Sequence, residues 1–196
     1  MKKEYIDRDH SYWLDGIQVP SVTQILTSEG FYNFTGVNSD LLERSSEFGK
    51  AVHETCRLWD MGILDVENLS LPLVPHLSAW KKFREAFGIE FIPELMEEHK
   101  INEKYRFGFC PDRVTKTFIL IDIKSSETPS PVAGLQTAGY KIGAEAEGYK
   151  INKRWAVHLH QDGNYSIQKY EDIAEESIFL MALQCYYWKQ RRLNRR

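Results

Sequence analysis

The chain has 196 residues, of which 42% are hydrophobic and 27% are charged, and its formal net charge at pH 7 is −3. This composition is ordinary for a soluble globular protein, and the length fits a single domain over residues 1–196. No apolar run approaches the roughly 20 residues of a membrane span, and the first residues lack the apolar stretch of a secretory signal. We therefore expect a cytoplasmic protein without a membrane partner.

The amino-terminal residues predict a β-hairpin and then a short helix. Residues 10–19 form the hairpin around Asp15-Gly16, a dipeptide that favours a tight two-residue turn. Ser21 and Gln24 have the spacing of a capping box, in which each side chain bonds to the backbone of the other. This pair predicts a helix that runs through Leu26.

Two longer helices are predicted over residues 40–61 and 75–87. Ser39 is the expected N-cap of the first, and Gly62 and Gly88 follow the two segments, where glycine favours a helix end. In both segments, apolar residues recur at spacings of three and four and therefore line one face. These residues are Phe48, Val52, Cys56, Trp59, Leu77, Trp80, Phe83 and Phe87.

The pattern then changes to that of strands. Four successive strands are predicted, over residues 89–92, 96–101, 105–114 and 117–124, and a turn at Thr115-Lys116 joins the last two. Residues 118–121 are apolar at consecutive positions, which indicates a strand covered on both faces.

A helix, a hairpin and a final helix complete the chain. Ser130 is the expected cap of the first helix, with Pro131 in its first turn. The hairpin pairs residues 155–160 with residues 165–170, and the last helix covers residues 172–191. Helices, a sheet and further helices in this order predict a layered α/β (α+β) domain.

The residues between 111 and 124 include two aspartates and a lysine that are candidates for a catalytic site. Side chains two apart on a strand share a face about 6.6 Å apart, so Asp122 and Lys124 point the same way while Ile121 and Ile123 point to the other side. The turn before this strand brings Asp112 opposite Asp122. Two converging carboxylates suit a divalent cation, which prefers oxygen ligands. The alternative is an Asp–Lys pair at the surface.

Two helices add further candidates. Gly49 precedes His53 by one turn, and its missing side chain would let a ligand or backbone approach the histidine. Gln136 and Tyr140 are four residues apart and share a helix face, where an amide and a phenol can contact a phosphate or a base. In isolation, a single helix histidine is more often structural or exposed than a ligand, and a core tyrosine with a surface glutamine is equally compatible with the second pair.

The ordered motifs resemble the PD-(D/E)XK nuclease superfamily, in particular its RecB-like branch of phage and prophage exonucleases. The resemblance covers about residues 10–140. It is carried by Gly49-x-x-x-His53, Gly108-Phe-Cys-Pro-Asp112, Asp122-Ile-Lys124 and Gln136-x-x-x-Tyr140, with His10 to Gly16 and Val19 to Thr23 similar to the start of phage members. It implies a restriction-endonuclease-like mixed central sheet flanked by helices.

The resemblance also implies roles for individual residues. Asp112 and Asp122 correspond to catalytic metal ligands and Lys124 to the catalytic lysine, while His53 and Ile123 would complete the metal site. Supporting or substrate-binding roles fall to Gln136, Tyr140, Ser125 and Gly49. Glu98 corresponds to a further carboxylate of the family, with Glu97 and Glu103 as alternatives.

The expected cofactor is Mg²⁺ or Mn²⁺, and a histidine ligand would make Mn²⁺ unusually effective. Some RecB-like nucleases hold an iron–sulfur cluster with four cysteines. This chain has only Cys56, Cys110 and Cys185, widely spaced, so we expect no cluster, no disulfide framework and a reducing compartment. No helicase motif is present, so DNA unwinding would need a recombination or helicase partner.

The main hypothesis is a metal-dependent DNA exonuclease acting on single strands or duplex ends. An endonuclease of the same fold (a resolvase or restriction-type enzyme), a catalytically inactive nucleic-acid-binding module and an interaction protein with an incidental acidic pair are the alternatives. Basic residues that could contact DNA, or only complement the end of a helix, form two groups. They are Lys150, Lys153 and Arg154, and Arg191, Arg192, Arg195 and Arg196.

Overall fold

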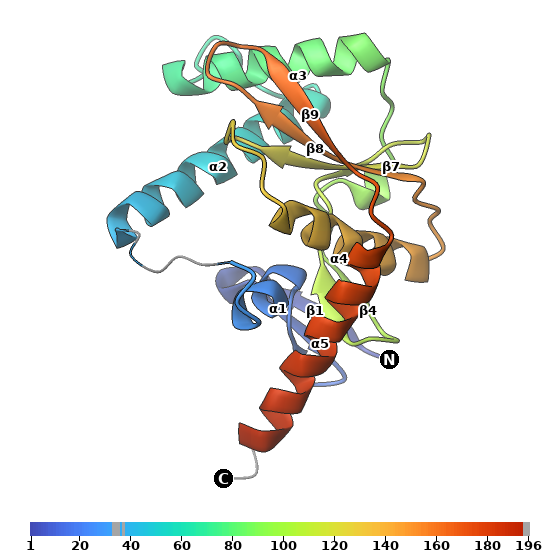
Figure 1. Ribbon diagram of the computed structural model, residues 1–196. Helices are drawn as coiled ribbons and strands as arrows, with labels where there is room; N and C mark the ends of the chain where they lie inside the picture. The colour runs from blue at the N-terminus through green and yellow to red at the C-terminus, as the bar shows by residue number, and fades with distance from the viewer. Residues whose placement is uncertain (33–35, 37, 194–196) are drawn as a thin grey trace.

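A four-stranded sheet lies at the centre of the computed structural model, which describes residues 1–32, 36 and 38–193. Its strand order is β6 (Arg113–Val114), β7 (Ile119–Lys124), β8 (Lys153–Leu159) and β9 (Tyr165–Tyr170). β7 and β8 are parallel, whereas the other two neighbouring pairs are antiparallel. The sheet is therefore mixed, and helices cover both of its faces (Figure 1), which confirms the predicted fold class.

One face of the sheet is covered by α2 (Ser39–Asp60) and α3 (Val74–Phe87). The predicted apolar stripes of these helices pack against the strands, with Val52, Trp80 and Phe83 fully buried beside Ile121 and Val157. α3 ends as predicted at Gly88, which adopts a left-handed conformation at φ 53°. The N-cap of α2 is Asn38 rather than Ser39, because the Asn38 side chain accepts bonds from the first free amides.

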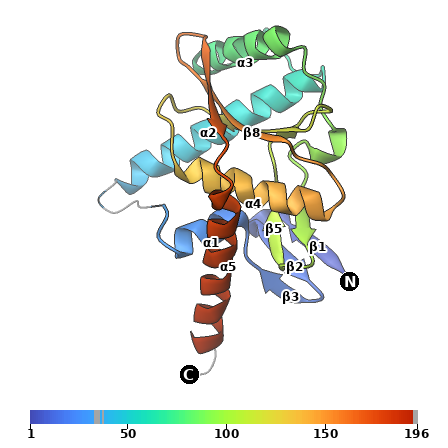
Figure 2. The same cartoon turned by 45° about the vertical axis from the view of Figure 1, so that its right-hand side comes forward.

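The other face is covered by α4 (Val132–Ala146), which is itself sandwiched between the sheet and a further layer. That layer contains α1 (Val22–Ser28) and α5 (Ala174–Leu193), which cross α4 on the side away from the sheet (Figures 1 and 2). The capping box of Ser21 and Gln24 is present at the start of α1, as predicted. The predicted cap at Ser130 is wrong, because the N-cap of α4 is Pro131 and no described side chain bonds to the first amides of the helix.

Two small sheets complete the molecule. The first contains β1 (Lys3–Ile6), β2 (Ser11–Leu14) and β3 (Ile17–Val19), and the predicted Asp15-Gly16 turn joins the last two. Both turn residues have positive φ, 52° and 76°, as this tight turn requires. The second sheet pairs β4 (Lys100–Asn102) with β5 (Phe107–Phe109).

The strand predictions before β6 need correction. Residues 89–92 form only an isolated bridge from Phe91 to Thr115, and Pro93–Leu95 is a short 3-10 helix. The predicted strand over 105–114 is divided into β5 and β6, which belong to different sheets. Pro111 lies at the division, where its missing amide hydrogen cannot continue a ladder. Two further 3-10 helices lie at Asp7–Asp9 and Leu71–Leu73.

Among the helices that the structure describes, none combines the length and the apolar character that crossing a membrane requires.

Candidate active site

Strand β7 carries two of the predicted site residues at its carboxyl end. Ile121 and Ile123 point into the core beneath α2 and α3, so Asp122 and Lys124 point to the opposite face, toward α4. The Asp122 side chain is buried and that of Lys124 is half-buried. The alternation predicted from the sequence is therefore confirmed.

Asp112 reaches the same place from the other arm of the hairpin. It lies one residue before β6, in which Arg113 pairs with Ile121. Its Oδ2 accepts a hydrogen bond of 2.6 Å from the backbone amide of Ile123, and its Oδ1 lies 3.4 Å from Nδ1 of His53 on α2. The Asp112 carboxylate thus joins the strand that carries Asp122 and Lys124 to the helix that carries His53.

Lys124 is held between a carboxylate and an amide. Its Nζ lies 2.7 Å from Oδ2 of Asp122 and donates a hydrogen bond of 3.0 Å to Oε1 of Gln136. The Gln136 side chain donates in turn to the Tyr140 hydroxyl at 2.9 Å, and its Oε1 also accepts a bond of 3.2 Å from the Tyr32 hydroxyl. Gln136 and Tyr140 are both buried and, as predicted, act from one face of α4.

The charges of the site are balanced within it. Burial lowers the pKa of His53, but Asp112, Glu97 and Asp122 outweigh burial and raise it to about 9. Burial likewise opposes the charge of Lys124, yet Asp122 and Asp112 keep the pKa of that ammonium above its usual value. Two cations therefore face two carboxylates.

The two carboxylates respond differently to this environment. Burial raises the pKa of both groups. At Asp112 the His53 ring outweighs burial, so the pKa of that carboxyl is lowered. At Asp122 burial and the neighbouring Asp112 prevail over Lys124, so its pKa is raised. A further positive charge near Asp122 would favour its ionised form.

The oxygen atoms of this site are of the chemical type that a divalent cation accepts. Oδ2 of Asp122 is buried, and apart from the nearby Lys124 ammonium no described donor is oriented to give it a hydrogen bond. Two carboxylates and the backbone carbonyl of Ile123 are hard oxygen ligands of the kind that Mg²⁺ and Mn²⁺ accept. Within the described residues, no three His, Cys, Asp or Glu side chains already form a metal-binding group. The His53 ring lies against Asp112, with 3.4 Å between Nδ1 and Oδ1.

The acidic residue on the segment before β4 that approaches the site is Glu97, not Glu98. Glu97 is half-buried, and its Oε1 accepts a bond of 2.7 Å from Arg113. Glu98 is exposed. Oε1 of Glu103 lies 3.1 Å from Nζ of Lys3, a residue of the small amino-terminal sheet. Glu97 has a positive φ of 57° and lies before β4, so the regular strand predicted over residues 96–101 does not form at this point.

Gly49 has a smaller role than the sequence indicates. A Cβ atom at this position would lie 3.6 Å from Oγ of Ser125, which is an ordinary contact. An approach of another segment to His53 therefore does not require glycine here. The contact does place Ser125 beside α2, at the edge of the site.

Sequence reasoning missed a buried ionic network beneath Asp112. Arg113 is fully buried; its Nε donates to Oδ2 of Asp60 at 2.9 Å, and its Nη1 donates to the backbone carbonyl of Asp112 at 2.6 Å. Oδ1 of Asp60 accepts bonds from Trp80 and Arg84. The available signal was an arginine within the strand predicted over residues 105–114, because a charged side chain that a strand buries needs a partner.

The predicted basic groups are dispersed. Arg154 is buried and bonds to Glu175 at 2.8 Å, so it is not available to DNA, whereas Lys150 and Lys153 are exposed. Arg191 and Arg192 lie in the last turn of α5. Arg195 and Arg196 lie outside the described residues.

The sequence matches no protein-family model and no curated protein. Among solved structures, the crystal structure of an alkaline exonuclease (LHK-Exo) from Laribacter hongkongensis is similar over 63% of this chain and 72% of its own, with 19% identity and a TM-score of 0.39. LHK-Exo in complex with dAMP is similar over 91% of this chain and 95% of its own, with 14% identity and a TM-score of 0.41. Both similarities are remote, and what the site does is inferred below from its own residues.

Proposed function

We propose that this protein is a divalent-metal-dependent deoxyribonuclease that hydrolyses phosphodiester bonds from DNA ends. The observation that supports this proposal is the bond from the Ile123 amide to the Asp112 carboxylate, which fixes that carboxylate beside Asp122 and Lys124. Two carboxylates and an ammonium around one point are the groups that metal-assisted phosphodiester hydrolysis uses.

Each residue has a distinct task in this proposal. Asp112, Asp122 and the carbonyl of Ile123 would hold Mg²⁺ or Mn²⁺, with His53 beside them. A divalent cation bound there supplies positive charge to the phosphodiester and makes water more acidic. Lys124 steadies the attacking water or the negative charge that develops on the phosphate. Gln136 holds the Lys124 ammonium in place, and Tyr140 holds Gln136.

Substitution of the central residues tests the proposal. Asp122→Ala and Lys124→Ala should each lower the cleavage rate of end-labelled DNA by at least about 100-fold, the scale of a lost catalytic group. Lys116→Ala is the matched control, because Lys116 lies on the same hairpin but is exposed, and its ion pair is with the exposed Glu90 and not with a residue of the site. Full activity in either site variant would refute the assignment.

The topology of the substrate separates exonuclease from endonuclease. An exonuclease leaves covalently closed circular DNA intact and degrades the same molecule once it is linear, whereas an endonuclease nicks the circle. Single- and double-stranded end-labelled oligonucleotides, compared in parallel, give the strand preference. A protein that binds these substrates and a divalent ion but cleaves none of them would be a binding module of this fold.

A further inference from the structure

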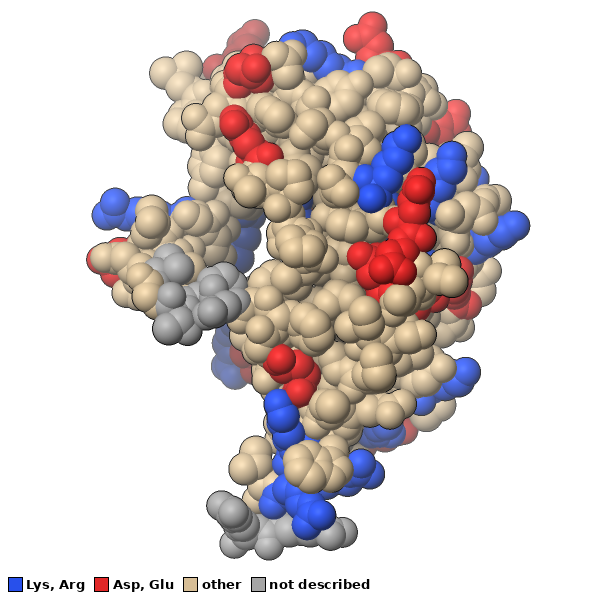
Figure 3. Space-filling model, viewed as in Figure 1, with Lys and Arg blue, Asp and Glu red and all other residues tan. Residues whose placement is uncertain are grey.

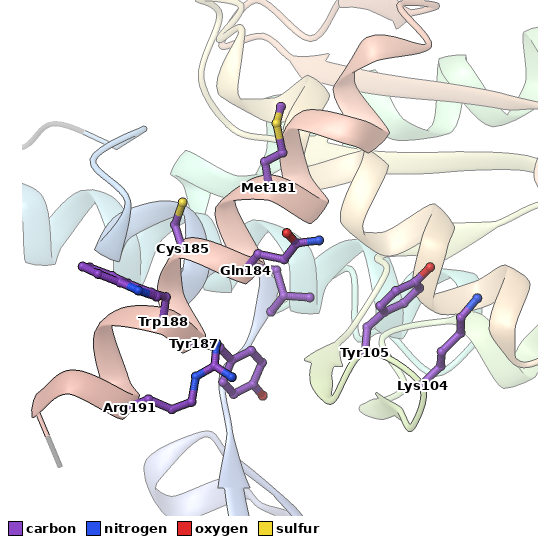
Figure 4. A pocket seen from close by; sticks show the side chains of 9 residues that line it. Lys104, Tyr105, Met181, Gln184, Cys185, Tyr187, Trp188 and Arg191 are labelled. Carbon is purple, nitrogen blue, oxygen red and sulfur yellow. The ribbon is translucent and has the colours of Figure 1, made fainter. Parts of the chain in front are cut away.

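A groove separate from the candidate active site lies along the last helix. It has a volume of about 700 Å³ and runs between the carboxyl-terminal half of α5 and the turn that joins β4 to β5. Met181, Trp188 and Arg191 line it from α5, and Lys104 and Tyr105 line it from the turn (Figure 4). None of the residues assigned to the candidate active site lines this groove.

The groove carries one exposed aromatic ring, that of Trp188, and the half-buried ring of Tyr105, and a cation lies near each. The Trp188 side chain is 56% exposed, an unusual position for so large an apolar surface. The Arg192 guanidinium lies 5.5 Å from the centroid of the Trp188 ring, and the Lys104 ammonium lies 4.8 Å from that of Tyr105. Each ring therefore has a positive charge within cation–π distance.

The cations of the groove lack acidic partners. Over residues 1–32, 36 and 38–193, no carboxylate forms an ion pair with Lys104 or Arg191, which line the groove, or with Arg192, which lies beside Trp188. Lys189 on the same helix differs, because it pairs with Glu29 at 2.8 Å. Lysine and arginine side chains gather at the end of the molecule formed by the tip of α5 (Figure 3). In a chain of net charge −3, this is a local concentration of positive charge.

We propose that this groove binds single-stranded DNA as an accessory site. A single strand offers flat bases that stack on aromatic rings and phosphates that pair with free cations, and the groove supplies both. An acidic peptide could satisfy the cations but has no bases to stack on Trp188. This inference rests on the proposed function, because it takes DNA as the substrate. It adds a second contact, in which the groove binds a part of the strand that is not being cleaved.

The test measures binding without cleavage. A fluorescently labelled oligothymidylate is titrated with the full chain in EDTA, and affinity is read from anisotropy. Trp188→Ala should weaken binding about tenfold, as expected for the loss of one stacked base, and Trp188→Phe should restore most of it. Arg191→Gln should weaken binding and reduce its salt dependence, whereas Lys189→Gln, on the same helix but outside the groove, should match the wild type.

Several results would overturn the inference. Unchanged affinity in Trp188→Ala would exclude stacking, provided that the thermal unfolding curve shows a folded variant. An equal loss of affinity for duplex and single-stranded DNA would exclude single-strand recognition. A change in sedimentation coefficient without a change in affinity would identify the groove as an interface between copies of this chain. Because EDTA removes any cleavage, failure here leaves the nuclease proposal standing, and an inactive enzyme with intact binding would refute only the nuclease.

Discussion

At the scale of single residues, Arg113 connects the candidate site to the interior of the protein. Its guanidinium is fully buried, bonds to Asp60 and Glu97, and holds the backbone carbonyl of Asp112. A buried ion pair contributes little net stability, because desolvation offsets the attraction, but removing one partner leaves an uncompensated charge. We infer that this network fixes the position of Asp112 more than it stabilises the fold.

Substitution of Asp60 tests this reading of the network. Asp60→Ala should lower the free energy of unfolding by about 3–5 kcal/mol, because Arg113 and Arg84 lose their shared carboxylate in a buried environment. Urea denaturation measures the change. Glu90→Ala, which breaks the exposed pair with Lys116, is the control and should cost at most about 1 kcal/mol. Equal losses in the free energy of unfolding for Asp60→Ala and Glu90→Ala would show that the unpaired buried arginines cost no more than an unpaired surface charge.

His53 gives a second prediction at this scale. Imidazole suits Mn²⁺ better than Mg²⁺, so a histidine beside the carboxylates should make Mn²⁺ the more effective ion. His53→Ala should lower the ratio of the cleavage rates in Mn²⁺ and Mg²⁺, each measured at saturating ion. A wild-type enzyme in which Mn²⁺ never exceeds Mg²⁺ would show that His53 acts through Asp112 and not as a ligand.

At the scale of elements, α4 is a helix that other parts of the molecule approach closely. It lies between the sheet and the layer of α1 and α5, and two-thirds of its residues are buried. Glycines permit this packing: a Cβ atom at Gly143 would lie 2.5 Å from Cγ of the buried Phe109, and one at Gly139 would lie 2.9 Å from the Phe179 ring. Since α4 also carries Gln136 and Tyr140, its close packing fixes the groups that hold Lys124.

Alanine at two glycines distinguishes packing from simple helix propensity. Gly143→Ala should destabilise the protein by about 1–3 kcal/mol, because Phe109 is buried and cannot move away from the new methyl group. Gly49→Ala in α2 should stabilise it by about 0.5–1 kcal/mol, since its methyl group meets only Oγ of Ser125 at 3.6 Å. Thermal unfolding of both variants measures the difference. Similar shifts in the same direction would contradict the packing of α4.

At the scale of the whole molecule, the structural features that the sequence predicts are those that depend on residues close together in the chain. The Asp15-Gly16 turn, the capping box of Ser21 and the helix end at Gly88 are local features and were predicted correctly. The placement of Asp112 opposite Asp122 follows from one short turn, and the structure has it. Division of residues 105–114 between two sheets was not predicted, because strand pairing depends on distant segments.

In the candidate site, too, contacts within one element could be predicted from the sequence and contacts between distant segments could not. Gln136 and Tyr140 are four residues apart, and their shared helix face was predicted from that spacing. The contact between Lys124 on β7 and Gln136 on α4 joins two elements, and no local period gives it. The bond between Arg113 and Asp60 joins residues 53 positions apart, and no local pattern indicates which acid an arginine will meet. The sequence favoured Glu98 over Glu97 because it predicted a regular strand over residues 96–101, whereas the chain turns at Glu97 and β4 begins only at Lys100.

The central claim is that Asp112 and Asp122 together hold a divalent cation, and calorimetric titration with Mn²⁺ tests it most directly. We predict saturable binding to the wild-type protein and to Lys116→Ala, and an affinity at least about tenfold lower for Asp122→Asn. Circular dichroism should show that all three proteins keep the same fold. Absence of binding in the wild type, or equal affinity in Asp122→Asn, would contradict the account.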